Sequence, residues 1–414
     1  MPVPVATEKD VRLFRKIRSL QDRTQPPQTA QGDYFRTTLI QLNRAVGRLW
    51  DLRWSSQRAI QTAVSGASRY GSAVSEKYGT GIVTQFVQIL TESLRRGIRV
   101  EDYYSYQLYL PERWRSRARQ FPMQGQAVPA QYYLNKRDCP ADFEPLQNKH
   151  LFAARCKEAG LPSVPTLAEF VDGHPERDFR DLPRMDLLSK PVNLFAGTGV
   201  VSWRYDQTRD CFTDSLTGQK FSRDALLDHL CGLSKCGRVI LQPRLRNHPS
   251  LSVLTNGALS TIRLVTCRPP SGIIDQMPPV IRLPTGRSVV DNFAKGGLAA
   301  PVDLATGIVC GPALQKDVRL GVISHNHHPD TEVGLKGFSV PMWTEAVNLS
   351  YCAHKTFPSV HFVGWDIAVL QHGPVLVEAN ALFDTDLTVI PHVLTLSDTQ
   401  FIPYYLYHWA NSVR

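Results

Sequence analysis

The chain contains the stretch FVGWDIAVLQHGPVLVEAN at residues 362–380. Residues 362–370 and 374–380 are apolar runs rich in branched side chains, and such runs are typical of buried β-strands. The intervening loop, residues 371–373, ends in a glycine, which can adopt the left-handed conformation that a three-residue hairpin loop requires. The stretch therefore predicts a β-hairpin.

Polar side chains converge on one face of this predicted hairpin. A three-residue loop pairs Leu370 with Pro374, so that Asp366 lies directly opposite Glu378. Alternate residues of a strand share a face, so Asn380 joins Glu378. Two facing carboxylates repel each other unless a cation lies between them. Oxygen ligands without Cys or His suit Mg²⁺, and we therefore expect a magnesium site at these three residues.

The alternative is a pair of exposed carboxylates on a solvated face of the hairpin. The apolar side chains that surround the polar ones favour buried strands instead. The apolar residues expected to be buried are Ile367, Val369, Val375 and Val377.

Upstream of the hairpin, the sequence combines lysines with a glycine-containing loop. Lys149 lies on a predicted helix, and Lys190 ends an apolar strand. The loop that follows contains Gly197, Thr198 and Gly199. Glycines let backbone N–H groups approach phosphates, and lysines neutralise their charge. On their own the glycines favour an ordinary loop, since neither the Walker nor the dinucleotide spacing is present. The two lysines upstream and the predicted metal-binding hairpin downstream favour a phosphate-binding loop.

The stretch RVILQPRLRNHP begins at residue 238 and predicts an apolar strand that runs into Gln242 and Pro243. Its end could present backbone donors and acceptors to an adenine ring. A strand end followed by a simple turn explains the same residues.

The remaining patterns predict an α+β architecture. Helices are expected over 148–160, closed by Gly160, and over 342–357, opened by Pro341. Further strands are expected over 187–192, 238–245, 259–268 and 288–293.

The first 125 residues predict a mainly helical region. A short basic helix is expected over 8–20. A further helix is expected after it, because apolar residues repeat at three- and four-residue steps and form one apolar face; these residues are Leu39, Leu42, Val46 and Leu49. Small residues near 72–83 mark a break before a second helix that ends at Gly97. An aromatic segment then begins at residue 101 and ends at Pro111.

Composition predicts an ordinary globular protein. The 414 residues are 43% hydrophobic and 20% charged, enough for a sizeable core. No run of eighteen apolar residues and no secretory signal is present, so a cytoplasmic location is expected. The eight cysteines are scattered, which favours reduced thiols.

The net charge of +10 arises in residues 1–150, where 23 Lys and Arg oppose 13 Asp and Glu. Such a basic region could touch nucleic acid, lipid head groups or a phosphorylated substrate. Because the basic residues are spread out, a solvated helical surface is the favoured interpretation.

Taken in order, these segments resemble the ATP-grasp superfamily and, more narrowly, the sugar-transfer-associated ATP-grasp family. They span about two thirds of the chain. The segments that carry the resemblance are EDYYSYQLY (101–109), NKHLFAARCKEAGLPSVPT (148–166), LSKPVNLFAGTGV (188–200), ILQPRLRNHP (240–249), LSTIRLVT (259–266), VDNFAKGGLAAPVDLATG (290–307), HPDTEVGLKGFSVP (328–341) and FVGWDIAVLQHGPVLVEAN (362–380).

The resemblance implies an ATP-grasp fold, in which two α+β subdomains clasp ATP. It implies phosphate contacts from Lys149 and Lys190, a small-residue loop over the phosphates at 195–200, and an adenine hinge at Gln242. One departure is Asn148, where many members carry Asp.

The resemblance also assigns roles to later residues. Arg263 would lie near the transferring phosphate, and the N-x-x-x-G-G element maps to Asn292, Gly296 and Gly297. The implied magnesium ligands are Asp366, Glu378 and Asn380.

On this basis we expect three regions: a helical one at 1–125, a linker with the lid subdomain at 126–240, and a metal-binding C-terminal subdomain at 241–414. The expected activity is ATP- and Mg²⁺-dependent ligation of a small-molecule carboxylate to an amine through an acyl phosphate, with Arg263 and Lys190 as catalytic residues. A phosphotransferase acting on a hydroxyl and an inactive nucleotide-binding module are the alternatives. A homodimeric assembly remains open.

Several other polar residues have weaker patterns. His325, His327 and His328 form an H-x-H-H cluster in a loop, for which a substrate-contacting loop or a solvated turn is favoured over a metal site. His248 and Lys336 could approach ATP or the acceptor. No Ser/His/Asp or Cys/His arrangement predicts covalent catalysis by the protein.

Overall fold

The structure is a computed structural model that describes residues 57–96, 98–111, 127, 130–132, 134–135, 139–176, 179, 181–192, 199–269, 271–286 and 291–412. Contacts divide the chain into two compact units, one with residues up to 130, 316–323 and 393–406, and the other with the remainder. The predictions for 8–20 and 39–49 lie outside the described residues. Among those described, no helix is both long and apolar enough to cross a membrane.

The first unit contains a helix at 57–78, followed by α3 (Ile82–Arg96) and α4 (Val100–Ser105). The break predicted near 72–83 falls at 79–81, where Gly79 has a left-handed φ of 75°. The aromatic segment is buried: Tyr104 stacks on Tyr70 at 4.2 Å and donates a hydrogen bond to Gln85. Helical structure in the N-terminal region is thus confirmed.

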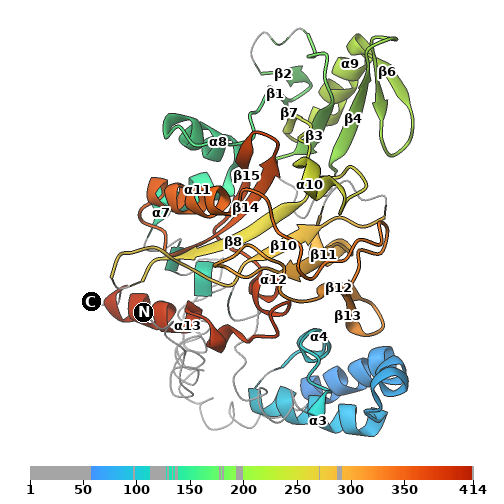
Figure 1. Cartoon of the computed structure of the whole chain (residues 1–414), viewed down its shortest axis with the longest axis vertical. Helices are drawn as coiled ribbons and strands as arrows, with labels where there is room; N and C mark the ends of the chain where they lie inside the picture. Colours follow the sequence, from blue (N-terminus) through green and yellow to red (C-terminus); the bar gives the residue numbers. More distant parts are fainter. Residues whose placement is uncertain are drawn as a thin grey trace, which may run out of the picture. The chain divides into compact units, whose positions relative to one another are not determined.

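The second unit contains a smaller sheet and most of a larger one (Figure 1). The smaller sheet has the order β2-β1-β7-β3-β4-β5-β6, all antiparallel, and α9 covers its apolar face. Its elements are β1 (Ala168–Val171), β2 (His174–Pro175), β3 (Leu187–Pro191), β4 (Val201–Asp206), β5 (Cys211–Asp214), β6 (Lys220–Ser222), α9 (Arg223–Ser234) and β7 (Val239–Pro243).

The larger sheet has the order β13-β12-β11-β10-β8-β14-β15, with β9 paired to β8. Its strands are β8 (Thr261–Cys267), β9 (Asp275–Gln276), β10 (Val280–Leu283), β11 (Leu298–Pro301), β12 (Ala313–Asp317), β13 (Gly321–His325), β14 (Phe362–Leu370) and β15 (Gly373–Asn380). The remaining elements are α7 (Pro140–Gln147), α8 (Lys149–Glu158), α10 (Pro249–Ser252), η1 (Phe293–Lys295), α11 (Trp343–Thr356), α12 (Thr385–Val389), η2 (Leu396–Asp398) and α13 (Phe401–Ser412).

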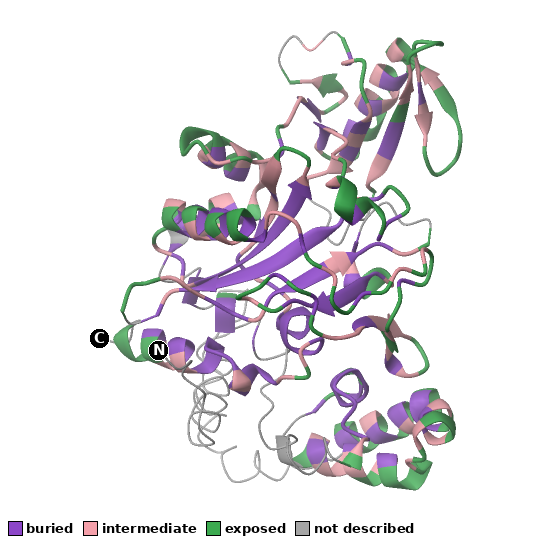
Figure 2. Ribbon diagram, viewed as in Figure 1, coloured by how far each residue is buried: buried purple, intermediate pink, exposed green. Residues whose placement is uncertain are grey.

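The larger sheet is buried on both faces around β8, as Figure 2 shows. Ile262 and Leu264 of β8 join the apolar core together with Trp365 of β14. Thr261 and Arg263 point to the opposite face, because successive side chains of a strand alternate. A charged residue therefore lies in the middle of a buried strand.

The predicted hairpin exists, but its loop is shorter than expected. Leu370 pairs with Gly373 rather than Pro374, so the turn has two residues instead of three. A β-bulge at Val377 then adds one residue to β15 and restores Asp366 to its position opposite Glu378. The predicted pairing is correct because a shorter turn and a bulge compensate.

Two further predictions need correction. The strand expected over 288–293 falls partly outside the described residues, and its described end is not a strand: Asp291 and Asn292 have no regular secondary structure, and Phe293 begins η1. Val375 and Val377 are half-buried rather than buried, because Leu376 faces the core and its two neighbours in the strand face away from it. The expected helices at 148–160 and 342–357 are confirmed as α8 and α11.

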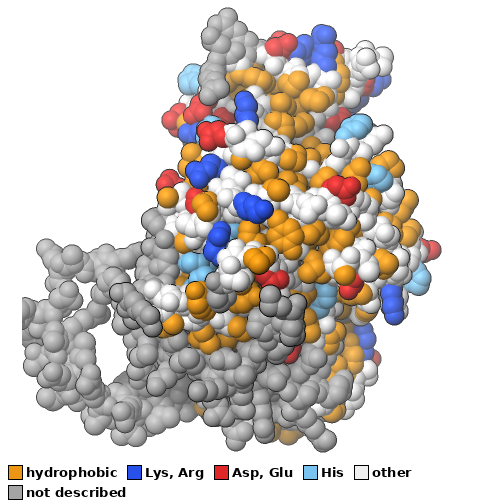
Figure 3. All heavy atoms as spheres, turned by 60° about the vertical axis from the view of Figure 1, so that its left-hand side comes forward, with side chains coloured by type: hydrophobic (Ala, Val, Ile, Leu, Met, Phe, Trp, Pro, Cys, Tyr) orange, Lys and Arg blue, Asp and Glu red, His pale blue; other side chains and the backbone are white. Residues whose placement is uncertain are grey.

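On the face of the molecule drawn in Figure 3, the charged side chains of the described residues are dispersed. On the face drawn in Figure 3, Lys and Arg side chains lie among acidic and apolar ones and do not form a single patch there. The basic residues before residue 57 lie outside the described part.

Candidate functional site

A cleft lies between the smaller sheet and β15 of the larger one. It consists of two adjoining hollows with cavity volumes of about 20 and 390 Å³ that share Val164, Lys190, Gln242 and Val377. Small-molecule sites commonly enclose about 300–1,000 Å³. The cleft therefore has room for a nucleotide-sized ligand.

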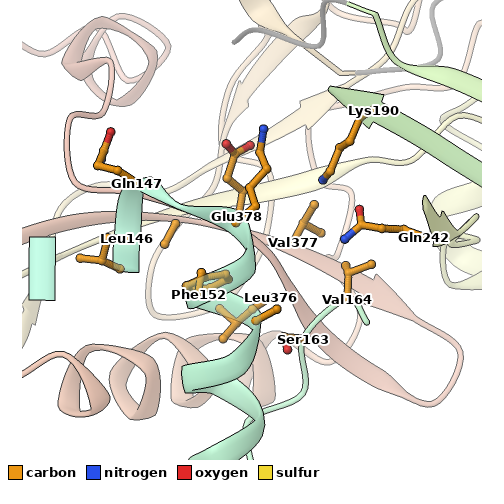
Figure 4. Close-up of a pocket in the computed structure, with 13 residues that line it drawn as sticks. Leu146, Gln147, Phe152, Ser163, Val164, Lys190, Gln242, Leu376, Val377 and Glu378 are labelled. Carbon is orange, nitrogen blue, oxygen red and sulfur yellow. The ribbon is translucent and has the colours of Figure 1, made fainter. Parts of the chain in front are cut away.

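The smaller sheet presents one face to this cleft. On this face, Leu188 of β3 lies between two polar side chains. It pairs with Gln242 of β7 on one side and with Ser202 of β4 on the other. Lys190 follows on the same face of β3. In Figure 4, Lys190 and Gln242 reach into the cleft from this sheet, and Glu378 reaches into it from β15.

The electrostatics of the cleft combine two lysines with one carboxylate. Burial, with the neighbouring charge of Lys149, lowers the pKa of Lys190 to about 8, while Glu378 acts in the opposite direction. Glu378 is half-buried and forms no side-chain hydrogen bond within the described residues. The ammonium groups of Lys149 and Lys190 and the carboxylate of Glu378 thus line the same hollow.

Lys149 is positioned by the start of α8. The side chain of Asn148 accepts hydrogen bonds from the backbone N–H groups of His150 and Leu151, at 3.0 and 3.3 Å. Asparagine is among the favoured residues at a helix N-terminus. The departure at Asn148 therefore preserves the local structure that carries Lys149.

A buried network of charges lies next to the cleft on the polar face of the larger sheet. Arg263 donates to both oxygens of Asp366, at 2.6 and 3.1 Å. Arg282 of β10 donates to Asp366 at 3.2 Å and to Asp291 at 2.5 Å. Thr261 donates to the other oxygen of Asp291. Two guanidinium groups are therefore neutralised by two carboxylates.

Asp366 remains ionised in this network. Burial alone would raise its pKa, but Arg263 and Arg282 outweigh burial and hold the pKa below its usual value. Asn380 donates a long hydrogen bond of 3.5 Å to the same carboxylate. Asp366 is only 3% exposed, and both its oxygens already accept hydrogen bonds.

The oxygen donors suit Mg²⁺ in chemical type, and the three predicted ligands lie together at the start of the hairpin. Glu378 offers a free carboxylate, whereas Asp366 would have to exchange a guanidinium contact to bind a metal ion. Within the residues that the structure describes, no group of three or more His, Cys, Asp and Glu side chains is arranged to hold a metal.

Other predicted site residues are placed as follows. Gly197 and Thr198 lie outside the described residues, and Gly199 has a left-handed φ of 73°. Asn292 caps η1 by accepting from the backbone N–H of Ala294, and Gly296 ends η1 with a φ of 92°. The N-x-x-x-G-G element is thus a tight turn after Asp291.

Gly297→Ala is expected to lower the free energy of unfolding by about 1–3 kcal/mol, because a Cβ atom would lie 2.8 Å from the backbone oxygen of Asp291. Chemical denaturation of the full chain measures this loss. Gly232→Ala in α9 is the control, since nothing lies within 4 Å of its Cβ position. Alanine there should be neutral or stabilising. Equal effects of the two substitutions would contradict the prediction.

The histidines singled out in the sequence have structural contacts. His328 is buried; its Nε2 donates to the carbonyl of Pro284, and its Nδ1 accepts from the N–H of Asp330. His325 contacts Gln315, and His327 is exposed. His248 caps α10.

Sequence reasoning missed Arg282 and Asp291. A signal for Arg282 is present, because the tripeptide Ile-Arg-Leu occurs twice, at 262–264 and 281–283. In both copies a charged residue interrupts an apolar strand, and the two strands are neighbours in the sheet. Asp291 has no comparable signal in its own segment.

The model of the family described as sugar-transfer associated ATP-grasp matches residues 129–397. The chain belongs to this family. The predicted ATP-grasp fold, with a helical region before it, is therefore confirmed. No curated protein matches the sequence of this ATP-grasp protein.

Solved structures similar to this ATP-grasp chain include D-alanine–D-alanine ligase from Bacillus anthracis complexed with ATP, at 13% identity over 64% of this chain and 68% of that one, with a TM-score of 0.35. The L-amino acid ligase from Bacillus licheniformis is 11% identical over 66% and 52% of the chains, with a TM-score of 0.37. N5-carboxyaminoimidazole synthetase from Staphylococcus aureus complexed with ADP is 10% identical over 61% and 52%, with a TM-score of 0.32. Identities this low indicate nothing about a shared substrate.

Proposed function

We propose that the chain is an ATP-dependent carboxylate–amine ligase. The observation that carries this proposal is the cleft in which Lys149 and Lys190 oppose the free carboxylate of Glu378, in a chain of the ATP-grasp family. Lysines neutralise a triphosphate, and a carboxylate on the other side can hold its counter-cation. The apolar side chains of Leu188 and Val377 would enclose the base, with Gln242 at its edge.

In the proposed reaction, an oxygen of the substrate carboxylate attacks the γ-phosphorus, and the bond from that phosphorus to ADP breaks. The nitrogen of an amine then attacks the acyl carbon, phosphate leaves, and the nitrogen loses a proton. Arg263 has one terminal nitrogen that Asp366 does not engage, and this group would stabilise charge on the transferring phosphoryl group. The protein's contribution is positioning and electrostatics.

Mg²⁺ is part of this proposal. Glu378, Asn380 and Asp366 would hold it, and the ion would neutralise the β- and γ-phosphates. The residues themselves position the substrates: Lys149 and Lys190 orient the triphosphate, and Arg282 keeps Asp366 ionised.

The three-region division is also proposed. The smaller sheet falls within 126–240, except for the end of β7, and the larger sheet falls within 241–414, which supports these boundaries. A cytoplasmic location, a homodimeric state and an anionic partner for residues 1–125 remain predictions.

A screen of carboxylic acids against amines, with ATP and Mg²⁺, tests the reaction. Phosphate release that depends on the amine, with a hydroxamate formed when hydroxylamine replaces it, supports the ligase. A stable phosphorylated hydroxyl product without an amine would instead identify a phosphotransferase. ATP binding without any turnover across the screen would favour an inactive nucleotide-binding module.

Nucleotide binding is expected to weaken above pH 8. Lys190 is protonated below its pKa of about 8 and neutral above it, so binding a triphosphate at higher pH requires uptake of a proton. The dissociation constant of ATP should rise by up to about tenfold per pH unit. Calorimetric titration between pH 7 and 9.5 measures it. Lys190→Arg should remove most of the pH dependence of ATP binding, because a guanidinium stays protonated over this range. If the dissociation constants of the wild type and the variant rose in parallel with pH, titration of Lys190 could not be the cause.

A further inference from the structure

The two lysines of the cleft belong to different parts of the second unit. Lys149 begins α8, whose Phe152 and Cys156 pack in the core of the larger sheet. Lys190 lies on β3 of the smaller sheet. Their separation therefore depends on how α8 is held against the smaller sheet. Two ammonium groups in one cleft also repel each other.

One buried carboxylate connects these two parts. Glu169 is 6% exposed and lies on β1, opposite Ile240 of β7. Ile240 also pairs with Lys190, so Glu169 and Lys190 share the face that is turned towards the cleft. Glu169 contacts the ring Nδ1 of His150, the residue that follows Lys149.

The second oxygen of Glu169 binds the smaller sheet itself. It accepts a hydrogen bond of 2.7 Å from Arg238, the residue before β7. Arg238 also forms an ion pair with Glu176 at 3.1 Å, but Glu176 is more exposed than Glu169. Within the described part of the chain, Glu169 is an acidic side chain that contacts α8 and the smaller sheet together.

We propose that Glu169 is a positioning residue that sets the distance between Lys149 and Lys190 by tying His150 of α8 to Arg238 of the smaller sheet. This inference rests on the proposed nucleotide-binding function. A carboxylate held between two partners keeps the lysines close despite their repulsion. The cleft is then arranged for a triphosphate before the ligand arrives, which lowers the cost of ordering on binding.

The test measures binding of ATP and of adenosine to the full chain by calorimetric titration. Glu169→Gln and His150→Ala should each raise the dissociation constant of ATP about tenfold, since both break the same connection. Adenosine has no phosphates, so its dissociation constant should change by less than about twofold. Glu176→Gln is the matched control and should leave both values within about twofold.

A double-mutant cycle separates positioning from general loosening of the structure. In a Lys149→Ala background, Glu169→Gln should raise the dissociation constant of ATP by less than about twofold, because the lysine that it positions is absent. An undiminished tenfold effect in that background overturns the proposal. So does equal weakening of adenosine binding, or no effect of His150→Ala. Failure of the wild type to bind ATP would instead refute the proposed function.

Discussion

Glu378→Gln is expected to slow ATP consumption by about 10²–10³-fold, because it removes the free negative charge that faces the lysines across the cleft. The side chain forms no hydrogen bond within the described residues, so the free energy of unfolding should change by less than about 0.5 kcal/mol. Initial rates of phosphate release and denaturation curves measure the two quantities.

Glu345→Gln on α11 is the control for this substitution. Glu345 is an exposed carboxylate in the first turn of that helix and lines neither hollow of the cleft. Its loss should leave the rate unchanged. If Glu378→Gln retained a rate within about threefold of the wild type, Glu378 could not be a principal electrostatic group of the reaction.

The second large effect concerns stability. Arg263→Met should lower the free energy of unfolding by about 3 kcal/mol, because it leaves the buried carboxylate of Asp366 without its two shortest hydrogen bonds. The loss falls at the lower end of the range for buried pairs, since Arg282 continues to bind Asp366. Urea denaturation at neutral pH measures it.

Arg246→Met provides a matched control. Arg246 donates a 2.9 Å hydrogen bond to Asp186, but its side chain is 82% exposed. Exposed ion pairs contribute little, so this variant should lose less than about 1 kcal/mol. Similar losses in the two variants would mean that burial does not strengthen the Arg263 contact.

The difference in the free energy of unfolding between the wild type and the Arg263→Met variant should depend on pH. In the wild type the pKa of Asp366 is lowered, so its contribution to stability is present above the unfolded carboxyl pKa of about 3.9 and is lost as pH falls through the folded value. In the variant, burial meets less opposition and raises the pKa. The difference should therefore be largest near neutral pH and should shrink below about pH 4.

The hairpin illustrates what sequence patterns predict well. Apolar runs rich in branched side chains predict strands at 362–370 and 374–380, and the structure contains both. The exact turn was wrong, since Leu370 pairs with Gly373. Turn length and bulges depend on packing against other elements, and a bulge leaves no distinct mark in the pattern of β15.

The environment of Asp366 illustrates the opposite case. The hairpin pattern predicts Glu378 and Asn380 as its neighbours, and the predicted magnesium site rests on these residues and on the family resemblance. Its strongest contacts come from Arg263 and Arg282, which are far away in the chain. Neighbouring strands bring these residues onto one face, and strand order cannot be read from a single strand's pattern.

The amino-acid sequence by itself predicted the elements that carry the site, namely α8, α11, β3, β7, β8 and the β14–β15 hairpin, together with the pairing of Asp366 with Glu378 and the lysines upstream of that pair. These features follow from local periodicity and residue type. Only the tertiary structure decided that Asp366 is neutralised by two arginines, that Glu378 is left free in the cleft, and that Glu169 connects the parts that carry Lys149 and Lys190. The physical reason is that electrostatic interactions depend on distance and burial, and both are set when separate strands and helices pack together.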